Sequence, residues 1–86
     1  MHTVELLEEA LALATQLGYA TRHEWLGGAG GGACEFAGRK WVFVDLALNA
    51  TEQLEQVAEA LRNDPAIHTI RLNPPLKKLL RIHKAA

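Results

Sequence analysis

A glycine-rich segment followed at once by two strand patterns constrains this sequence more than any other feature. Residues 26–46 have the sequence LGGAGGGACEFAGRKWVFVDL. Glycine reaches positive φ without strain, and glycine at the first position of a two-residue turn favours a type II′ hairpin. The pattern predicts a loop, a strand at 33–37, a turn at residues 38–39 and a strand at 40–46.

This turn would place Phe36 opposite Trp41 and Cys34 opposite Phe43, with the aromatic rings on one face. The opposite face of the last strand is also apolar, which is typical of a central strand that is covered on both sides. We therefore expect an exposed apolar surface that a second copy of the chain can cover, with three residues as the predicted interface: Val42, Val44 and Leu46.

Helical and strand periodicities account for the remaining chain. Residues 4–17 carry a wide apolar face after a cap at Thr3, and residues 54–61 carry an apolar stripe after a capping box formed by Asn49 and Glu52. Residues 19–26 and 67–72 alternate as strands do, and the first of these would cover His23 among apolar neighbours. We expect the strand at 67–72 to lie parallel to that at 40–46, followed by a short helix at 76–83.

These elements predict a single α+β domain over residues 1–86, in the order α-β-β-β-α-β(-α). The expected architecture is a two-layer sandwich with a mixed, mostly antiparallel four-stranded sheet and both main helices on one face. The final helix or a second copy of the chain would cover the other face. At 86 residues a chain has a modest core, so a homodimer is a plausible source of further stability.

The charges are unevenly distributed although the net charge is only −1. All ten acidic residues precede position 66, whereas the last 21 residues contain five basic residues and no acidic one. We expect the basic C-terminal segment, residues 73–86, to pack over the acidic helices of its own chain or of a partner. Nucleic-acid binding is the alternative, through four residues: Lys77, Lys78, Arg81 and Lys84.

The glycine loop is the main candidate for a ligand site. A dinucleotide fingerprint requires a helix after the loop, and a phosphate loop requires Lys and Ser/Thr, so neither pattern fits. Bare amides can still bind an anion, although a simple connection is the more economical interpretation. The candidate residues for a small anionic ligand are Gly28, Gly30, Gly31 and Gly32, with Arg39 and Lys40 as charge partners.

Catalytic and metal chemistry have little support in the sequence. Cys34 and His23 suggest a nucleophile pair, but a structural cysteine is the commoner case, and we assign no catalytic residue. Asp45 lies in an apolar strand, so its carboxylate needs hydrogen-bond donors, and the backbone amides of the glycine loop can supply them. The four histidines have no ligand spacing, so no metal or cofactor is expected. The absence of a signal segment and of a long apolar run predicts a cytoplasmic protein without a membrane span.

The residues from Trp25 through Asp45, especially GGGACEFAGRKWVFVD, resemble the signature of a family of small bacterial proteins of uncharacterised function. The likeness extends through the helix that contains Leu54 and Leu61, and so covers more than half of the chain. The resemblance implies neither an activity nor catalytic residues. The sequence favours a non-enzymatic, dimeric interaction module, with anionic-ligand binding and nucleic-acid binding as alternatives.

Overall fold

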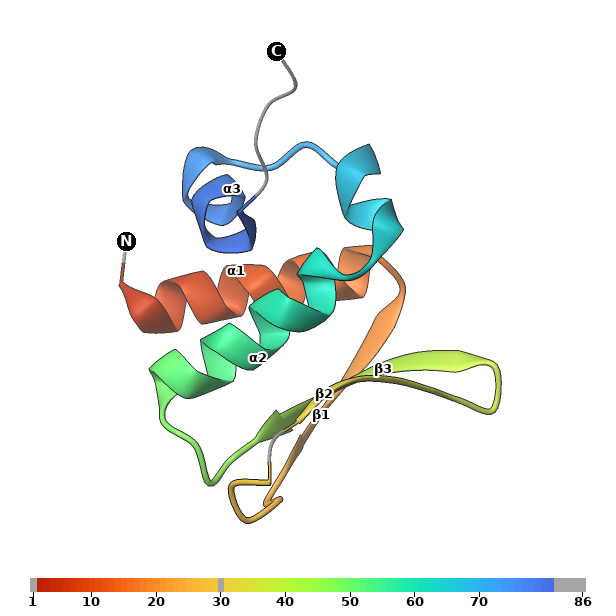
Figure 1. Cartoon of the computed structure of the whole chain (residues 1–86), viewed down its shortest axis with the longest axis vertical. Coiled ribbons are helices and arrows are strands. Elements are labelled where there is room, and N and C mark those ends of the chain that lie inside the picture. Colours follow the sequence, from red (N-terminus) through yellow and green to blue (C-terminus); the bar gives the residue numbers. More distant parts are fainter. Residues whose placement is uncertain (1, 30, 82–86) are drawn as a thin grey trace.

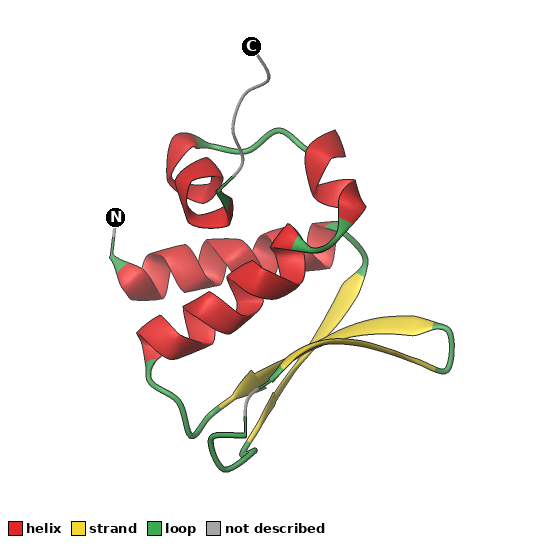
Figure 2. Cartoon of the chain, in the orientation of Figure 1, coloured by secondary structure: helices red, strands yellow, loops and turns green. Residues whose placement is uncertain are grey.

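The computed structural model describes residues 2–29 and 31–81, which fold into the α+β arrangement of helices and strands shown in Figures 1 and 2. The elements in chain order are α1 (Thr3–Gln16), β1 (Tyr19–Glu24), β2 (Gly32–Phe36), β3 (Arg39–Asp45), α2 (Ala50–Arg62), the 3-10 helix η1 (Pro65–Thr69) and α3 (Pro74–Leu80).

The sheet has three strands in the order β1-β3-β2, and β3 is central as its sequence predicts. β1 runs parallel to β3, and β2 runs antiparallel to it. The predicted fourth strand at 67–72 is wrong, since residues 65–69 form η1. Pro65 supplies the fixed φ that starts a helical turn, and the Asp64 carboxylate accepts the Ala66 N–H at 2.9 Å, which caps that turn.

The hairpin turn lies at Ala37 and Gly38, one residue earlier than predicted. Both residues have positive φ, 54° and 76°, as a type I′ turn requires. Phe36 therefore pairs with Arg39, and Cys34 pairs with Trp41. Moving the turn by one residue moves the pairing by two, so each side chain remains on its predicted face.

Helices α1 and α2 lie side by side on one face of the sheet, and α3 lies on the side of these helices away from the sheet (Figure 1). The final helix therefore does not cover the second face of the sheet. Asn49 and Glu52 form the predicted capping box at the start of α2. At α1 the cap differs from the prediction, because His2 is the N-cap and Thr3 is the first helical residue.

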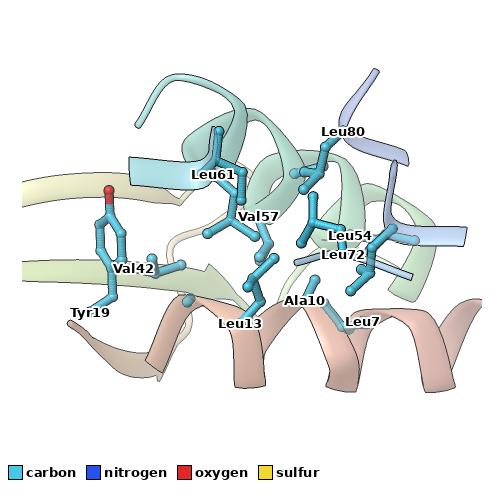
Figure 3. Close-up of a cluster of buried hydrophobic side chains, with 14 of the residues drawn as sticks. Leu7, Ala10, Leu13, Tyr19, Val42, Leu54, Val57, Leu61, Leu72 and Leu80 are labelled. Atoms are coloured by element: carbon cyan, nitrogen blue, oxygen red, sulfur yellow. The ribbon is translucent and has the colours of Figure 1, made fainter. Parts of the chain in front are cut away.

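The hydrophobic core lies between the sheet and the two long helices and continues between these helices and α3 (Figure 3). Val42 and Val44 of β3 are fully buried in it, together with Val57 and Leu61 of α2. Val42 and Val44 thus face their own helices, and the interface predicted for them is wrong. Leu46, the third predicted interface residue, lies just after β3 and is half-buried.

Candidate interaction surface

The face of the sheet opposite the helices carries the aromatic side chains. Side chains alternate along a strand, so Trp41 and Phe43 point away from the helices that bury Val42 and Val44. The pairing of β1 and β2 with β3 places further residues beside them. We call this surface the open face, and it consists of Ala20, Arg22, Glu24, Cys34, Phe36, Arg39, Trp41 and Phe43.

The rings of the open face form a connected patch. Trp41 and Phe43 are stacked, with centroids 6.2 Å apart and planes at 26°. The guanidinium carbon of Arg39 lies 5.1 Å from the centre of the Trp41 ring, within cation–π distance. Phe36, near the hairpin tip, is 72% exposed. A Phe with so much exposed surface marks a place where a partner can remove apolar area from water.

A hollow of about 330 Å³ lies at the opposite end of β2 from the hairpin tip. Its open-face wall is formed by Cys34 and Phe43, and the glycine loop closes it at Leu26. The remaining lining is the small residues 31–33. The hollow therefore has mostly apolar walls and one thiol.

Asp45 holds the glycine loop in place, as the sequence predicts. Because β1 and β2 flank β3, the loop between them must cross the carboxyl end of β3, where Asp45 lies. The buried Asp45 carboxylate accepts the N–H groups of Leu26 at 3.0 Å, Gly28 at 2.9 Å and Ala47 at 2.9 Å. The loop thus binds the chain's own carboxylate.

The predicted anionic-ligand site does not assemble in this structure. The Gly28 amide is engaged by Asp45, and the Gly31 amide donates to Gln56 Oε1 at 2.8 Å. Gly30 lies outside the described residues. Arg39 and Lys40 are at the hairpin end of β3, whereas the loop crosses the other end of this strand. Neither cation therefore lies beside Gly32 or the loop.

Lys40 instead belongs to a polar cluster with Tyr19 and Asp64 at the edge of the core. The Tyr19 hydroxyl donates to Asp64 Oδ2 at 2.7 Å, and Lys40 Nζ lies 3.1 Å from the same oxygen. Burial, reinforced by the bond to Asp64, raises the pKa of Tyr19 from 10.0 to about 12. The Tyr19 hydroxyl, the Ala66 amide and Lys40 lower the pKa of Asp64 below 3.8. The cluster ties β1 and β3 to the end of α2.

Cys34 and His23 do not form a catalytic pair. They lie on β2 and β1, which are separated by β3, and they point to opposite faces of the sheet. Both side chains are exposed, so the predicted burial of His23 is wrong. β1 ends at Glu24, two residues before the end of the strand predicted at 19–26, and Trp25 is 74% exposed.

The basic segment packs onto the domain through α3. Leu76 and Leu80 are buried, while Lys77, Lys78 and Arg81 are exposed. The Arg62 guanidinium donates to the carbonyls of residues 79 and 80 at 3.3 Å each. These carbonyls at the C-terminal end of α3 thereby gain hydrogen-bond partners that the helix itself does not supply. Lys84 lies outside the described residues. The exposed lysines are thus on the helix that lies farthest from the open face (Figure 1).

Sequence reasoning missed which face of β3 stays open, and the charged neighbours do not reveal it. In the observed register both faces carry charged residues beside β3: Arg22, Glu24 and Arg39 on the aromatic face, and Glu35 and Lys40 on the valine face. The packing of the two long helices is what distinguishes the faces. The partners Gln56 and Asp64 leave no sequence signal either, since their contacts span 25 and 45 residues of sequence.

The described part of the chain contains neither a side-chain group that could hold a metal ion nor a helix that could span a membrane. Residues 2–29 and 31–81 contain no group of three His, Cys, Asp or Glu side chains placed to hold a metal ion. None of the described helices combines the length and the apolar character that crossing a membrane requires. Comparisons of this chain with protein-family models, curated proteins and solved structures found no match.

Proposed function

We propose that this protein is a non-enzymatic interaction module that forms a homodimer through its open face. One observation carries the proposal: the helices cover the valine face of the sheet, and the aromatic face retains a 72% exposed Phe36 beside Trp41 and Phe43. Aromatic residues and Arg are enriched at the centres of protein interfaces. The open face combines three aromatic rings with Arg22 and Arg39.

The two ends of the open face are complementary to each other, which favours a second copy as the partner. Phe36 projects at the hairpin end, and the hollow beside Leu26 and Phe43 lies about 13 Å away, four residues along β2 at ~3.3 Å each. A two-fold axis between these features would bring each Phe36 to the hollow of the other protomer. Two-fold interfaces are self-complementary in this way.

Nucleic acid fits the open face less well than a protein partner does. Stacking platforms for single strands lie in positively charged grooves that follow the phosphates. On the open face, Arg22 forms an ion pair with Glu24 at 2.6 Å, and Arg39 is the only other cation. The exposed Lys77 and Lys78 are on α3, which packs on the far side of the helices.

Light scattering on a sizing column tests the proposal with Phe36→Glu and a matched control, Val4→Glu. Both residues are large, apolar and exposed, but Val4 lies on α1. The open face is small compared with the ~800 Å² per partner of a standard interface, so we expect a weak dimer. Each protein should therefore be measured over a series of concentrations that reaches several hundred micromolar. We expect twice the 9.4 kDa mass of one chain for the wild type and Val4→Glu, and a folded monomer for Phe36→Glu.

The expected weakening by Phe36→Glu is large because the dimer buries two copies of the residue. Burying one Phe contributes about 2 kcal/mol, so losing both raises the dissociation constant about a thousandfold. A wild type that remains monomeric throughout the series overturns the proposal. A folded Phe36→Glu dimer would show that the copies associate through another surface and would overturn it as well. Circular dichroism establishes that each variant is folded.

A further inference from the structure

A groove runs between the free edge of β2 and the flank of α2, on the side of the sheet that carries the helices. Its volume is about 410 Å³, and it is lined by residues 31–33 and by Gln56, Glu59, Ala60 and Asn63. A second hollow of about 320 Å³ shares Gln56 and Glu59 and extends to the glycine loop at Gly28. The two hollows together follow one side of α2.

β2 is an edge strand with one charged residue, Glu35, to protect it. Its sequence, GACEF, has neither Pro nor Lys, and residues 33–36 are all exposed. The other edge strand, β1, ends with Arg22, His23 and Glu24. Within the described chain, the backbone groups of Gly32–Phe36 make no hydrogen bond outside the ladder with β3. Alternate N–H and C=O groups of β2 therefore remain free for another strand.

The flank of α2 beside this edge is acidic. Glu52, Glu55 and Glu59 line the two hollows, and among the described residues no Lys, Arg or His lines either one. Across residues 2–29 and 31–81, Glu55 and Glu59 form neither an ion pair nor a side-chain hydrogen bond. Glu35 adds a fourth carboxylate on the helix side of β2, because it pairs with Lys40.

One contact shows that side chains of α2 reach the backbone beside β2. Gln56 Oε1 accepts the Gly31 N–H at 2.8 Å, immediately before β2 begins. Glu59 lies about one turn further along α2 and lines the same groove without such a partner. An added strand in the groove would offer N–H groups and side chains at this position.

We infer that the β2–α2 groove binds an extended, basic segment of another protein, which adds to the sheet beside β2. Main-chain hydrogen bonds to an edge strand supply affinity in this mode, and every second side chain of the segment faces the groove. Lys or Arg at those alternate positions would meet Glu55, Glu59 and Glu35. A second copy of this chain is the poorer occupant, because joining two β2 edges would bring two acidic flanks together. The inference goes beyond dimerisation, which uses the open face.

A displayed library of random nine-residue peptides, selected against the full chain, tests the inference first. We expect enrichment of Lys or Arg at alternate positions. The enriched peptide is then titrated into ¹⁵N-labelled protein, and we expect saturable shifts of the amides of Gly32–Phe36 and of residues 56–63. The peptide with its alternate backbone amides methylated should not bind, since it lacks the N–H groups that pair with an edge strand.

Matched charge variants separate groove binding from general attraction to an acidic protein. The double substitution Glu55→Gln/Glu59→Gln should weaken peptide binding about tenfold, equivalent to 1.4 kcal/mol. Glu5→Gln/Glu8→Gln removes the same charge from α1 and should leave binding unchanged. Trp41→Ala, which truncates the open face on the central strand β3, should also leave it unchanged, so the groove and the dimer can fail separately.

Several results would overturn the inference. They are an absence of enriched peptides, enrichment of acidic or unpatterned sequences, and equal binding of the methylated peptide. Equal effects of the α1 and α2 charge variants would point to nonspecific attraction. Shifts of β2 amides that depend only on protein concentration would assign the edge to a second copy.

Discussion

Gly31 lies against the backbone of Phe43, so closely that a Cβ at position 31 would overlap the Phe43 carbonyl. The reason is topological. The connection from β1 to β2 must pass over β3, and Gly31 is where the chain returns beside that strand. Of the four loop glycines that the structure describes, Gly31 is the one with a contact that forbids a side chain; around Gly27, Gly28 and Gly32 there is open space.

Gly31→Ala should therefore destabilise the protein strongly, by about 3 kcal/mol, because neither the Cβ nor the Phe43 backbone can move aside easily. Gly27→Ala is the matched control. It adds the same atom in open space and carries only the strain of φ +68°, about 1 kcal/mol. Urea unfolding of the two variants measures the difference. Equal losses would contradict the close approach at Gly31.

Asp45→Asn should cost about 2 kcal/mol of unfolding free energy. The amide NH₂ group would replace one carboxylate oxygen and would face either the Gly28 N–H or the N–H groups of Leu26 and Ala47, which now donate to the carboxylate. Glu24→Gln, on an exposed carboxylate paired with Arg22, should change stability by less than about 0.5 kcal/mol. Similar values for both variants would show that the carboxylate does not hold the loop.

The Tyr19–Asp64 bond should make stability depend on pH at both extremes. The lowered pKa of Asp64 contributes stability above pH 3.8 that is lost as the pH falls through the folded-state pKa. The pKa of Tyr19, raised to about 12, contributes stability below pH 10 that is lost as the pH rises towards 12. The wild type should have a larger free energy of unfolding than Tyr19→Phe, and this difference should be constant near pH 7 and decrease at both low and high pH. A constant advantage at every pH would contradict the coupling.

Cys34 offers an independent test of the proposed dimer because it lies exposed on the open face. Alkylation by N-ethylmaleimide should slow as the protein concentration rises, since dimerisation covers the thiol. In Phe36→Glu the rate should not depend on protein concentration. A wild-type dimer with a concentration-independent rate would place its interface away from Cys34.

Local features of the fold were predictable because neighbours in sequence create them. The capping box needs only Asn49 and Glu52, three residues apart, and the central position of β3 follows from apolar residues on both of its faces. The link between Asp45 and the glycine loop was also foreseen, since an acid in an apolar strand requires donors close by. The turn was misplaced by one residue because glycine suits the second position of a type I′ turn as well as the first position of type II′.

Features that depend on contacts between residues far apart in the sequence were not predictable. Residues 67–72 alternate like a strand, but η1 begins at Pro65, and Ile67 and Leu72 are buried in the core instead. The groove beside β2 and the Tyr19–Asp64 cluster arise only where α2 ends next to the sheet. Neither leaves a pattern in the sequence of one segment.

Periodicity and turn chemistry act over a few residues, so the amino-acid sequence is enough to establish an α+β domain with a central strand, a glycine crossing and two amphipathic helices. Which face of β3 the helices bury depends on packing between residues that are far apart in the sequence. Both faces of β3 are apolar, so the hydrophobic effect alone does not distinguish them. The aliphatic stripes of α1 and α2 pack closely with Val42 and Val44, and the aromatic rings, with Arg and Glu beside them, remain on the open face.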